Sequence, residues 1–181
     1  MYKLQGRRIY LAALEREHCR KLFEDWEYDF ECVAEPMFIG QSLESADVWY
    51  EEIQKQVASG NTIRLGIFLN DGTPIGAIGL QDINWRNRNC SLGMDIVKLS
   101  NRSQGYGKEA CRLMLDYAFC NLGLERVSAG TNATNIGGQK SLEGVGFVLE
   151  GRYRRDVWVA GQYVDSLRYA ILRDEWKKNA E

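Results

Sequence analysis

The stretch Arg102-Ser-Gln-Gly-Tyr-Gly-Lys-Glu-Ala110 lies between a run typical of a strand and a run typical of a helix. Its glycines, Gly105 and Gly107, tolerate backbone angles that a side chain would forbid, so successive N–H groups can converge on one point. The helix that follows adds unpaired N–H groups and the positive end of its dipole. Because Arg102 and Lys108 bracket the turn with positive charge, the stretch predicts a site for a phosphate or pyrophosphate.

The glycine spacing excludes two common phosphate loops. The dinucleotide pattern G-x-G-x-x-G needs a third glycine where this chain has Ala110. A P-loop needs four residues between its glycines, followed by Lys and Ser or Thr. The ligand is therefore expected to be a different phosphate compound.

Length and composition indicate one domain, residues 1–181, with a sizeable core. A formal charge of -2 argues against a general nucleic-acid binder. No apolar run approaches the roughly 20 residues of a membrane span, and the first residues lack the apolar core of a signal peptide. The five cysteines are irregularly spaced, with no metal-ligand pairing or disulfide framework. We therefore expect a cytoplasmic protein with no nucleic-acid, membrane or metal partner.

Hydrophobic periodicity and turn residues predict a mixed succession of elements. Strands are expected near residues 9–12, 62–69, 74–83, 90–99, 126–130, 148–159 and 163–172, and helices near 15–26, 42–58, 108–122 and 136–144. A meander is thus followed by strand, loop, helix, strand and helix. This order predicts an α/β (α+β) fold, with a mixed central sheet of about seven strands flanked by about four helices.

From Ser91 onward, the order of elements and several motifs resemble the GNAT N-acetyltransferases of the RimJ/RimL type. Residues 104–110 resemble that family's Q-G-x-G-x-x-A loop, which cradles coenzyme A. Asn135, Glu143 and Gly146-Phe147 resemble its N…E-x-x-G-F signature, and residues 150–152 and 161–165 resemble its last hairpin. The N-terminal half matches only in outline, as expected if it carries substrate selectivity. The resemblance implies a single GNAT-like domain that uses acetyl-CoA as co-substrate.

The same resemblance assigns the residues that bind the cofactor. Loop N–H groups would hold the pyrophosphate, with charge from the two flanking cations, although a solvated surface cation explains each of these as well. The strand end would pair its backbone with the pantetheine arm and could polarise the thioester oxygen. Asn135 would bond to the same arm, and it also suits the N-cap of the next helix. The expected cofactor-binding residues are Val97, Lys98, Leu99, Arg102, Gln104, Gly105, Tyr106, Gly107, Lys108 and Asn135.

The general acid and base are less clearly marked. Relatives often place Tyr seven residues after this Asn or Ser three residues after it, whereas this chain has Leu142 and Gly138 there. Ser141 is a nearby hydroxyl, with a helix-surface serine as the alternative. Asp82 and Asp95 are candidate bases. For either carboxylate a structural role or a water relay is the alternative.

An acidic and aromatic stretch between the first two helices suggests the acceptor. Glu31 and Glu35 lie near Tyr28, and clustered carboxylates with aromatic faces favour a cationic amine. A solvated acidic helix end explains the same pattern. A polyamine-like small molecule is the expected acceptor. The alternatives are the α-amine of a ribosomal-type protein N-terminus, and a non-catalytic acyl-CoA-binding sensor.

Related proteins are often dimers, so a homodimer is a hypothesis for this chain, although the sequence itself does not determine the oligomeric state. The aromatic side chains of Trp158 and Tyr163 suit an interface as readily as a core.

Overall fold

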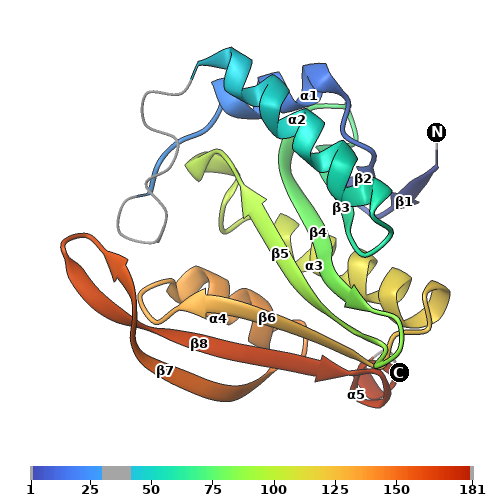
Figure 1. Ribbon diagram of the computed structural model, residues 1–181, viewed down its shortest axis with the longest axis vertical. Helices are drawn as coiled ribbons and strands as arrows, with labels where there is room; N and C mark the ends of the chain where they lie inside the picture. The colour runs from blue at the N-terminus through green and yellow to red at the C-terminus, as the bar shows by residue number, and fades with distance from the viewer. Residues whose placement is uncertain (1, 30–41, 180–181) are drawn as a thin grey trace.

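The computed structural model of the chain describes residues 2–29 and 42–179. Its strands form one mixed sheet in the order β1-β2-β3-β4-β5-β6-β8-β7 (Figure 1). The strands are β1 (Lys3–Gln5), β2 (Ile9–Ala12), β3 (Ile63–Leu69), β4 (Pro74–Asn84), β5 (Asn89–Ile96), β6 (Arg126–Asn132), β7 (Val148–Val159) and β8 (Gln162–Leu172).

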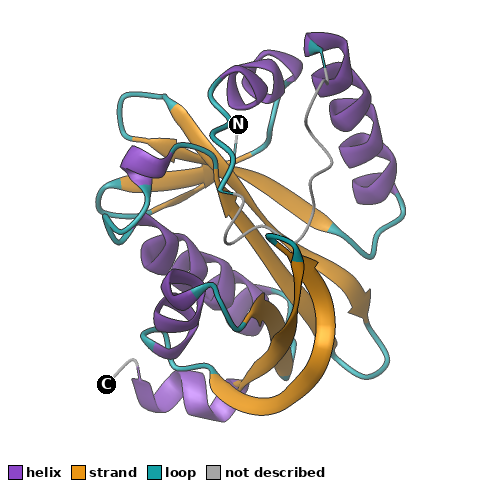
Figure 2. Ribbon diagram, turned by 90° about the vertical axis from the view of Figure 1, so that its left-hand side faces the viewer, coloured by secondary structure: helices purple, strands orange, loops and turns teal. Residues whose placement is uncertain are grey.

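The helices cover both faces of this sheet (Figure 2). They are α1 (Arg16–Glu24), α2 (Leu43–Ala58), α3 (Tyr106–Asp116), α4 (Ile136–Glu143) and α5 (Arg173–Asn179). One core joins α1 and α2 to the sheet around Leu22, Ile53 and Phe68. The larger core joins α3, α4 and α5 to the opposite face, around Ile78 and Met114.

The alternation of side chains along the strands explains the two cores. In β3, Ile63, Leu65 and Ile67 belong to the α3 side, whereas Phe68 belongs to the α1 and α2 side. β4 lies between β3 and β5 and is covered on both faces, so its first seven residues are all buried.

The sheet divides where its one parallel pair of strands separates. Pairing between β5 and β6 runs from Asn89↔Arg126 to Leu92↔Ala129. Beyond those residues β5 continues beside β4 as far as Ile96, and β6 continues beside β8. The two strands diverge toward the glycine loop, as Figure 1 shows. Backbone groups on the facing edges of the strands are therefore left without partners from the sheet.

The predicted fold class is confirmed, and every expected strand and helix is present. Within residues 2–29 and 42–179 the sheet has eight strands and there are five α-helices, slightly more than predicted. β1 has only three residues, mostly exposed, so it carried no hydrophobic pattern. β5 ends at Ile96 rather than at residue 99, because a 3-10 turn forms at Leu99–Asn101.

Candidate cofactor and acceptor site

The glycine loop ends in the uncapped N-terminus of α3. Gly105 adopts φ +83°, in the left-handed region, and the helix begins at the next residue. The N-cap residue is Gly105, which has no side chain to cap the helix, so the N–H groups of its first turn have no acceptor in the helix or in that residue's side chain. A Cβ on Gly107 would lie 2.9 Å from Met94 Cε and 3.6 Å from Ser141 Oγ, which shows how closely β5 and α4 approach the loop. The loop fits an anionic ligand such as a pyrophosphate.

The two predicted loop cations are engaged by other parts of the chain. Arg102 donates from Nε to the carbonyl of Ile96 at 3.0 Å and pairs with Asp29 at 3.0 Å. The Lys108 ammonium lies against Gly144, just after α4. Their contribution to phosphate binding remains a prediction.

Arg8 lies beside the loop and was missed by the sequence analysis. Its Nη1 donates to the carbonyl of Gln104 at 2.8 Å, and its guanidinium lies 4.9 Å from the centre of the Tyr106 ring. Its Nε pairs with Glu109 at 3.1 Å. Because these partners are about a hundred residues away along the chain, no local sequence signal could have revealed the contact.

The backbone predicted to pair with pantetheine is already bonded within the chain. The Val97 N–H donates to the carbonyl of Ile75 at 3.1 Å, and the Val97 carbonyl accepts from the Glu27 N–H at 3.0 Å. The Leu99 N–H donates to the Glu27 carboxylate at 2.6 Å. A pantetheine arm that uses the Leu99 N–H must therefore displace Glu27.

Asn135 is the N-cap of α4, which is the second of the two roles suggested for it by the sequence. Its Oδ1 accepts from the Gly138 N–H at 2.8 Å. A Cβ on Gly138 would lie 2.7 Å from Asn135 Nδ2 and 2.8 Å from Thr131 Oγ1. The serine that relatives often place there would not fit without movement. Leu142, at the position of the relatives' tyrosine, packs in the larger core.

Ser141 is not the surface serine of the alternative interpretation. Its Oγ is buried, and within the described part of the chain it has no hydrogen-bond partner. It lies beside Gly107, at the loop. A buried hydroxyl without a partner is available to a group that binds there.

The two candidate bases lie apart from Ser141. Met94 packs on the α3 side of β5, so its exposed neighbour Asp95 projects to the α1 and α2 side, where its charge acts on Arg64. Burial lowers the pKa of Arg64, and the Asp95 carboxylate opposes that shift. Asp82 is exposed near the end of β4 that leads into the β4–β5 turn, away from the glycine loop. The structure therefore favours Asp95 over Asp82.

Part of the acidic segment is neutralised within the protein. Asp25 pairs with Lys98 at 3.0 Å and with Lys21 at 2.9 Å, and Asp29 pairs with Arg102. Burial raises the pKa of Asp25, but hydrogen bonds from the two lysines hold it below its usual value.

The remaining predicted acceptor residues are only partly described. Tyr28 is half-buried, and burial raises its pKa. Glu31 and Glu35 lie outside the described residues.

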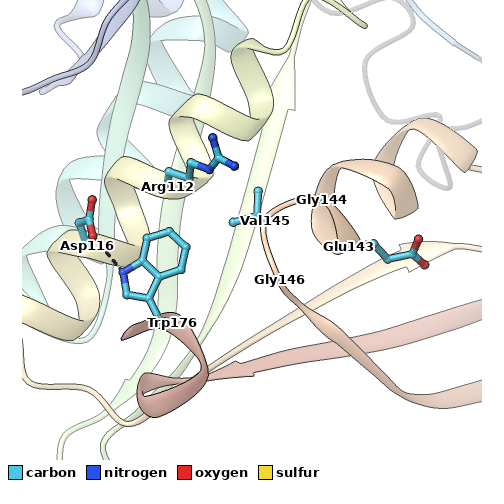
Figure 3. A pocket seen from close by; sticks show the side chains of 7 residues that line it. All are labelled: Arg112, Asp116, Glu143, Gly144, Val145, Gly146 and Trp176. Atoms are coloured by element: carbon cyan, nitrogen blue, oxygen red, sulfur yellow. Dashed lines mark hydrogen bonds between the residues drawn. The ribbon is translucent and has the colours of Figure 1, made fainter. Parts of the chain in front are cut away.

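A cavity of about 460 Å³ lies between α3, the turn after α4, and α5 (Figure 3). Trp176 closes one side of it and donates from its indole N–H to Asp116 at 2.9 Å. The Glu143 carboxylate accepts from the Tyr169 hydroxyl at 3.0 Å and points away from Arg112. The lining residues are Arg112, Asp116, Glu143, Gly144, Val145, Gly146 and Trp176. Gly144 also contacts the Lys108 ammonium, so the cavity adjoins the side chain that follows the glycine loop.

Across residues 2–29 and 42–179, no helix is both long and apolar enough to cross a bilayer. Within the same ranges, no group of three or more His, Cys, Asp and Glu side chains is placed to hold a metal ion.

The glycine loop and the diverging strands β5 and β6 lie within a part of the chain that matches a known family. Residues 8–148 match the acetyltransferase (GNAT) domain, so the chain belongs to the GNAT acetyltransferases. It is an acetyl-CoA-dependent N-acetyltransferase by family.

The names of its relatives give different acceptors. YdaF of Bacillus subtilis (strain 168), provisionally named a ribosomal N-acetyltransferase, is 30% identical over 173 residues, 93% of each chain. A spermidine N(1)-acetyltransferase from Vibrio cholerae is 26% identical over 107 residues, 59% of this chain and 61% of that protein. The crystal structure of a probable acetyltransferase has a TM-score of 0.85 at 27% identity, covering 97% of this chain and 99% of the other.

Proposed function

We propose that this enzyme transfers the acetyl group of acetyl-CoA to a primary amine of a cationic small molecule, such as a polyamine. The observation that carries the transfer is the glycine loop at the uncapped start of α3, beside diverging strands. The acceptor class is supported by the acidic residues between α1 and α2, and by relatives named as spermidine acetyltransferases.

The proposed chemistry divides between the two faces of β5. Acetyl-CoA supplies an activated thioester carbonyl. As the acceptor nitrogen forms its bond to the acetyl carbon and the carbon–sulfur bond breaks, Asp95 takes a proton from the nitrogen directly or through water. Ser141 or water returns a proton to the departing thiolate. Loop N–H groups hold the pyrophosphate during the transfer.

A second acceptor is a protein N-terminus. It is favoured by the relation to YdaF, which spans nearly the whole of both chains. Direct competition between spermidine and a basic N-terminal peptide would distinguish the two acceptors. The preferred acceptor is the one that needs the lower concentration to inhibit acetylation of the other.

We also propose a cytoplasmic location and a homodimer. The dimer proposal is supported by Trp158 and Tyr163, which stack edge to face at the tip of the β7–β8 hairpin and are each more than half exposed.

The acceptor proposal is tested by neutralising Glu31 and Glu35. The double variant Glu31→Gln, Glu35→Gln should raise KM for spermidine about tenfold, because two charges that attract a polycation are lost. KM for acetyl-CoA should stay within about twofold. The matched control, Glu17→Gln with Glu52→Gln, removes two exposed charges from α1 and α2. Equal effects on both substrates, or on both double variants, would refute the polycation-binding role.

A further inference from the structure

The turn between β1 and β2 is hydrogen-bonded to the first turn of α3. The Glu109 carboxylate accepts from the backbone N–H groups of Arg7 and Arg8 at 2.6 and 2.8 Å. Burial raises the pKa of Glu109, but these hydrogen bonds outweigh it and hold the pKa below its usual value. A Cβ on Gly6 would lie 2.6 Å from Glu109 Oε1, so the turn approaches as closely as a glycine allows. The turn between β1 and β2 is therefore held against the helix that carries the glycine loop.

Arg8 extends this attachment to the loop itself. Its Nε is held by Glu109 and its Nη1 donates to the Gln104 carbonyl at 2.8 Å. Its Nη2 lies 3.0 Å from the place where a Cβ on Gly105 would stand. The planar guanidinium thus bridges the helix and the peptide that joins Gln104 to Gly105.

The geometry of that peptide determines what the bridge does. All described peptide bonds are trans, and in a trans peptide the C=O and the N–H point in opposite directions. When Arg8 holds the Gln104 carbonyl, the Gly105 N–H must point away from Arg8. Gly105 takes φ +83°, and because it has no Cβ, this peptide can turn more freely than one followed by a residue with a side chain.

Arg8 adds little net charge to the site, because the Glu109 carboxylate beside it is negative. The contribution expected from this pair is orientation of the loop, with its donors fixed before a ligand arrives.

We propose that Arg8 is a positioning residue for cofactor binding. It fixes the Gln104–Gly105 peptide so that the Gly105 N–H joins the donors that receive the pyrophosphate of acetyl-CoA. This inference rests on the proposed role of the loop in cofactor binding.

Calorimetric titration tests the inference without an acceptor amine. CoA, dephospho-CoA and pantetheine are titrated into the wild-type protein and the variants Arg8→Ala, Arg8→Lys and Arg7→Ala. Dephospho-CoA keeps the pyrophosphate, whereas pantetheine has no phosphate. Arg7 provides the matched control, because its side chain is exposed and its backbone makes the contacts described above.

Arg8→Ala should weaken CoA and dephospho-CoA equally, by about tenfold, which is the effect of losing one charge-assisted hydrogen bond. Pantetheine affinity should change by less than about twofold, because it makes no pyrophosphate contact. Arg7→Ala should leave all three affinities within about twofold. Arg8→Lys should resemble Arg8→Ala, because an ammonium cannot hold Glu109 and Gln104 with the geometry of the guanidinium fork.

Three results would overturn the positioning role. Equal weakening of all three ligands by Arg8→Ala would indicate a general structural effect. Full rescue by Arg8→Lys would indicate that charge alone matters. Unchanged CoA affinity in Arg8→Ala, with a wild-type preference for CoA over pantetheine, would refute the inference while leaving the proposed function intact. If the wild-type protein shows no such preference, the loop assignment fails as well.

Discussion

Asp95 is the residue that we propose as the general base. It is exposed on the α1 and α2 side of β5, beyond the point where β5 and β6 stop pairing. Asp95→Asn should lower kcat about a hundredfold, the usual effect of losing a general base. CoA affinity should stay within about twofold, because the carboxylate lies on the opposite face of the strand from Met94 and the loop. Thiol release at saturating substrates and CoA titration provide the two measurements.

Asp82→Asn is the matched control for this prediction. Asp82 is exposed near the far end of β4, so its loss should leave kcat within about twofold. A comparable fall in both variants would point to general electrostatics. Full activity in Asp95→Asn would rule out Asp95 as the base and favour a water relay.

Single residues show how far the sequence could predict this site. Gly105 and Gly107 could be recognised because the loop is a local motif. Arg8 could not, because its role depends on contacts with Gln104 and Glu109, far along the chain. Ser141 was predicted to be near the site, but its burial beside Gly107 depends on how α4 packs against α3.

At the scale of elements, α3 presents two cations toward the α4–β7 turn. Lys108 and Arg112 are four residues apart, so they lie on the same side of the helix. Lys108 contacts Gly144, and Arg112 lines the cavity that Gly144 also borders (Figure 3). CoA carries a 3′-phosphate in addition to its pyrophosphate, and this cavity is a candidate place for it.

Arg112→Gln should therefore weaken CoA about fivefold, in the range of one partly solvated charge contact. Dephospho-CoA lacks the 3′-phosphate, so its affinity should not change. Arg88→Gln, an exposed change in the β4–β5 turn, is the control and should affect neither ligand. Equal weakening of CoA and dephospho-CoA by Arg112→Gln would contradict this use of the cavity. The affinities can be measured by calorimetry.

The positions of the helices and strands along the chain were largely predictable, whereas the contacts between them were not. Hydrophobic periodicity located α2 and β3 to within a residue or two. The contacts of Asp25 and Glu27 with Lys98 and Leu99 join the segment after α1 to the end of β5. Such pairing depends on tertiary packing. The sequence pattern therefore suggested that the acidic side chains were available to a ligand, whereas some of them form ion pairs or hydrogen bonds within the protein.

The whole molecule is a sheet that opens between β5 and β6, with the glycine loop at the open end. One face carries α1, α2 and Asp95, and the other carries α3, α4 and Ser141. In the proposed mechanism, a cofactor held by the loop meets an acceptor that arrives from the opposite face. We propose that acetyl transfer to an amine occurs across this opening.

The most direct test is thiol release from acetyl-CoA in the presence of spermidine, an aminoglycoside, free amino acids or a basic N-terminal peptide, with mass analysis of each product. One thiol should be released for each acetyl group found on an amine, with spermidine preferred among the small molecules. Tight binding of acetyl-CoA without thiol release on any of these acceptors would contradict it and favour an acyl-CoA sensor.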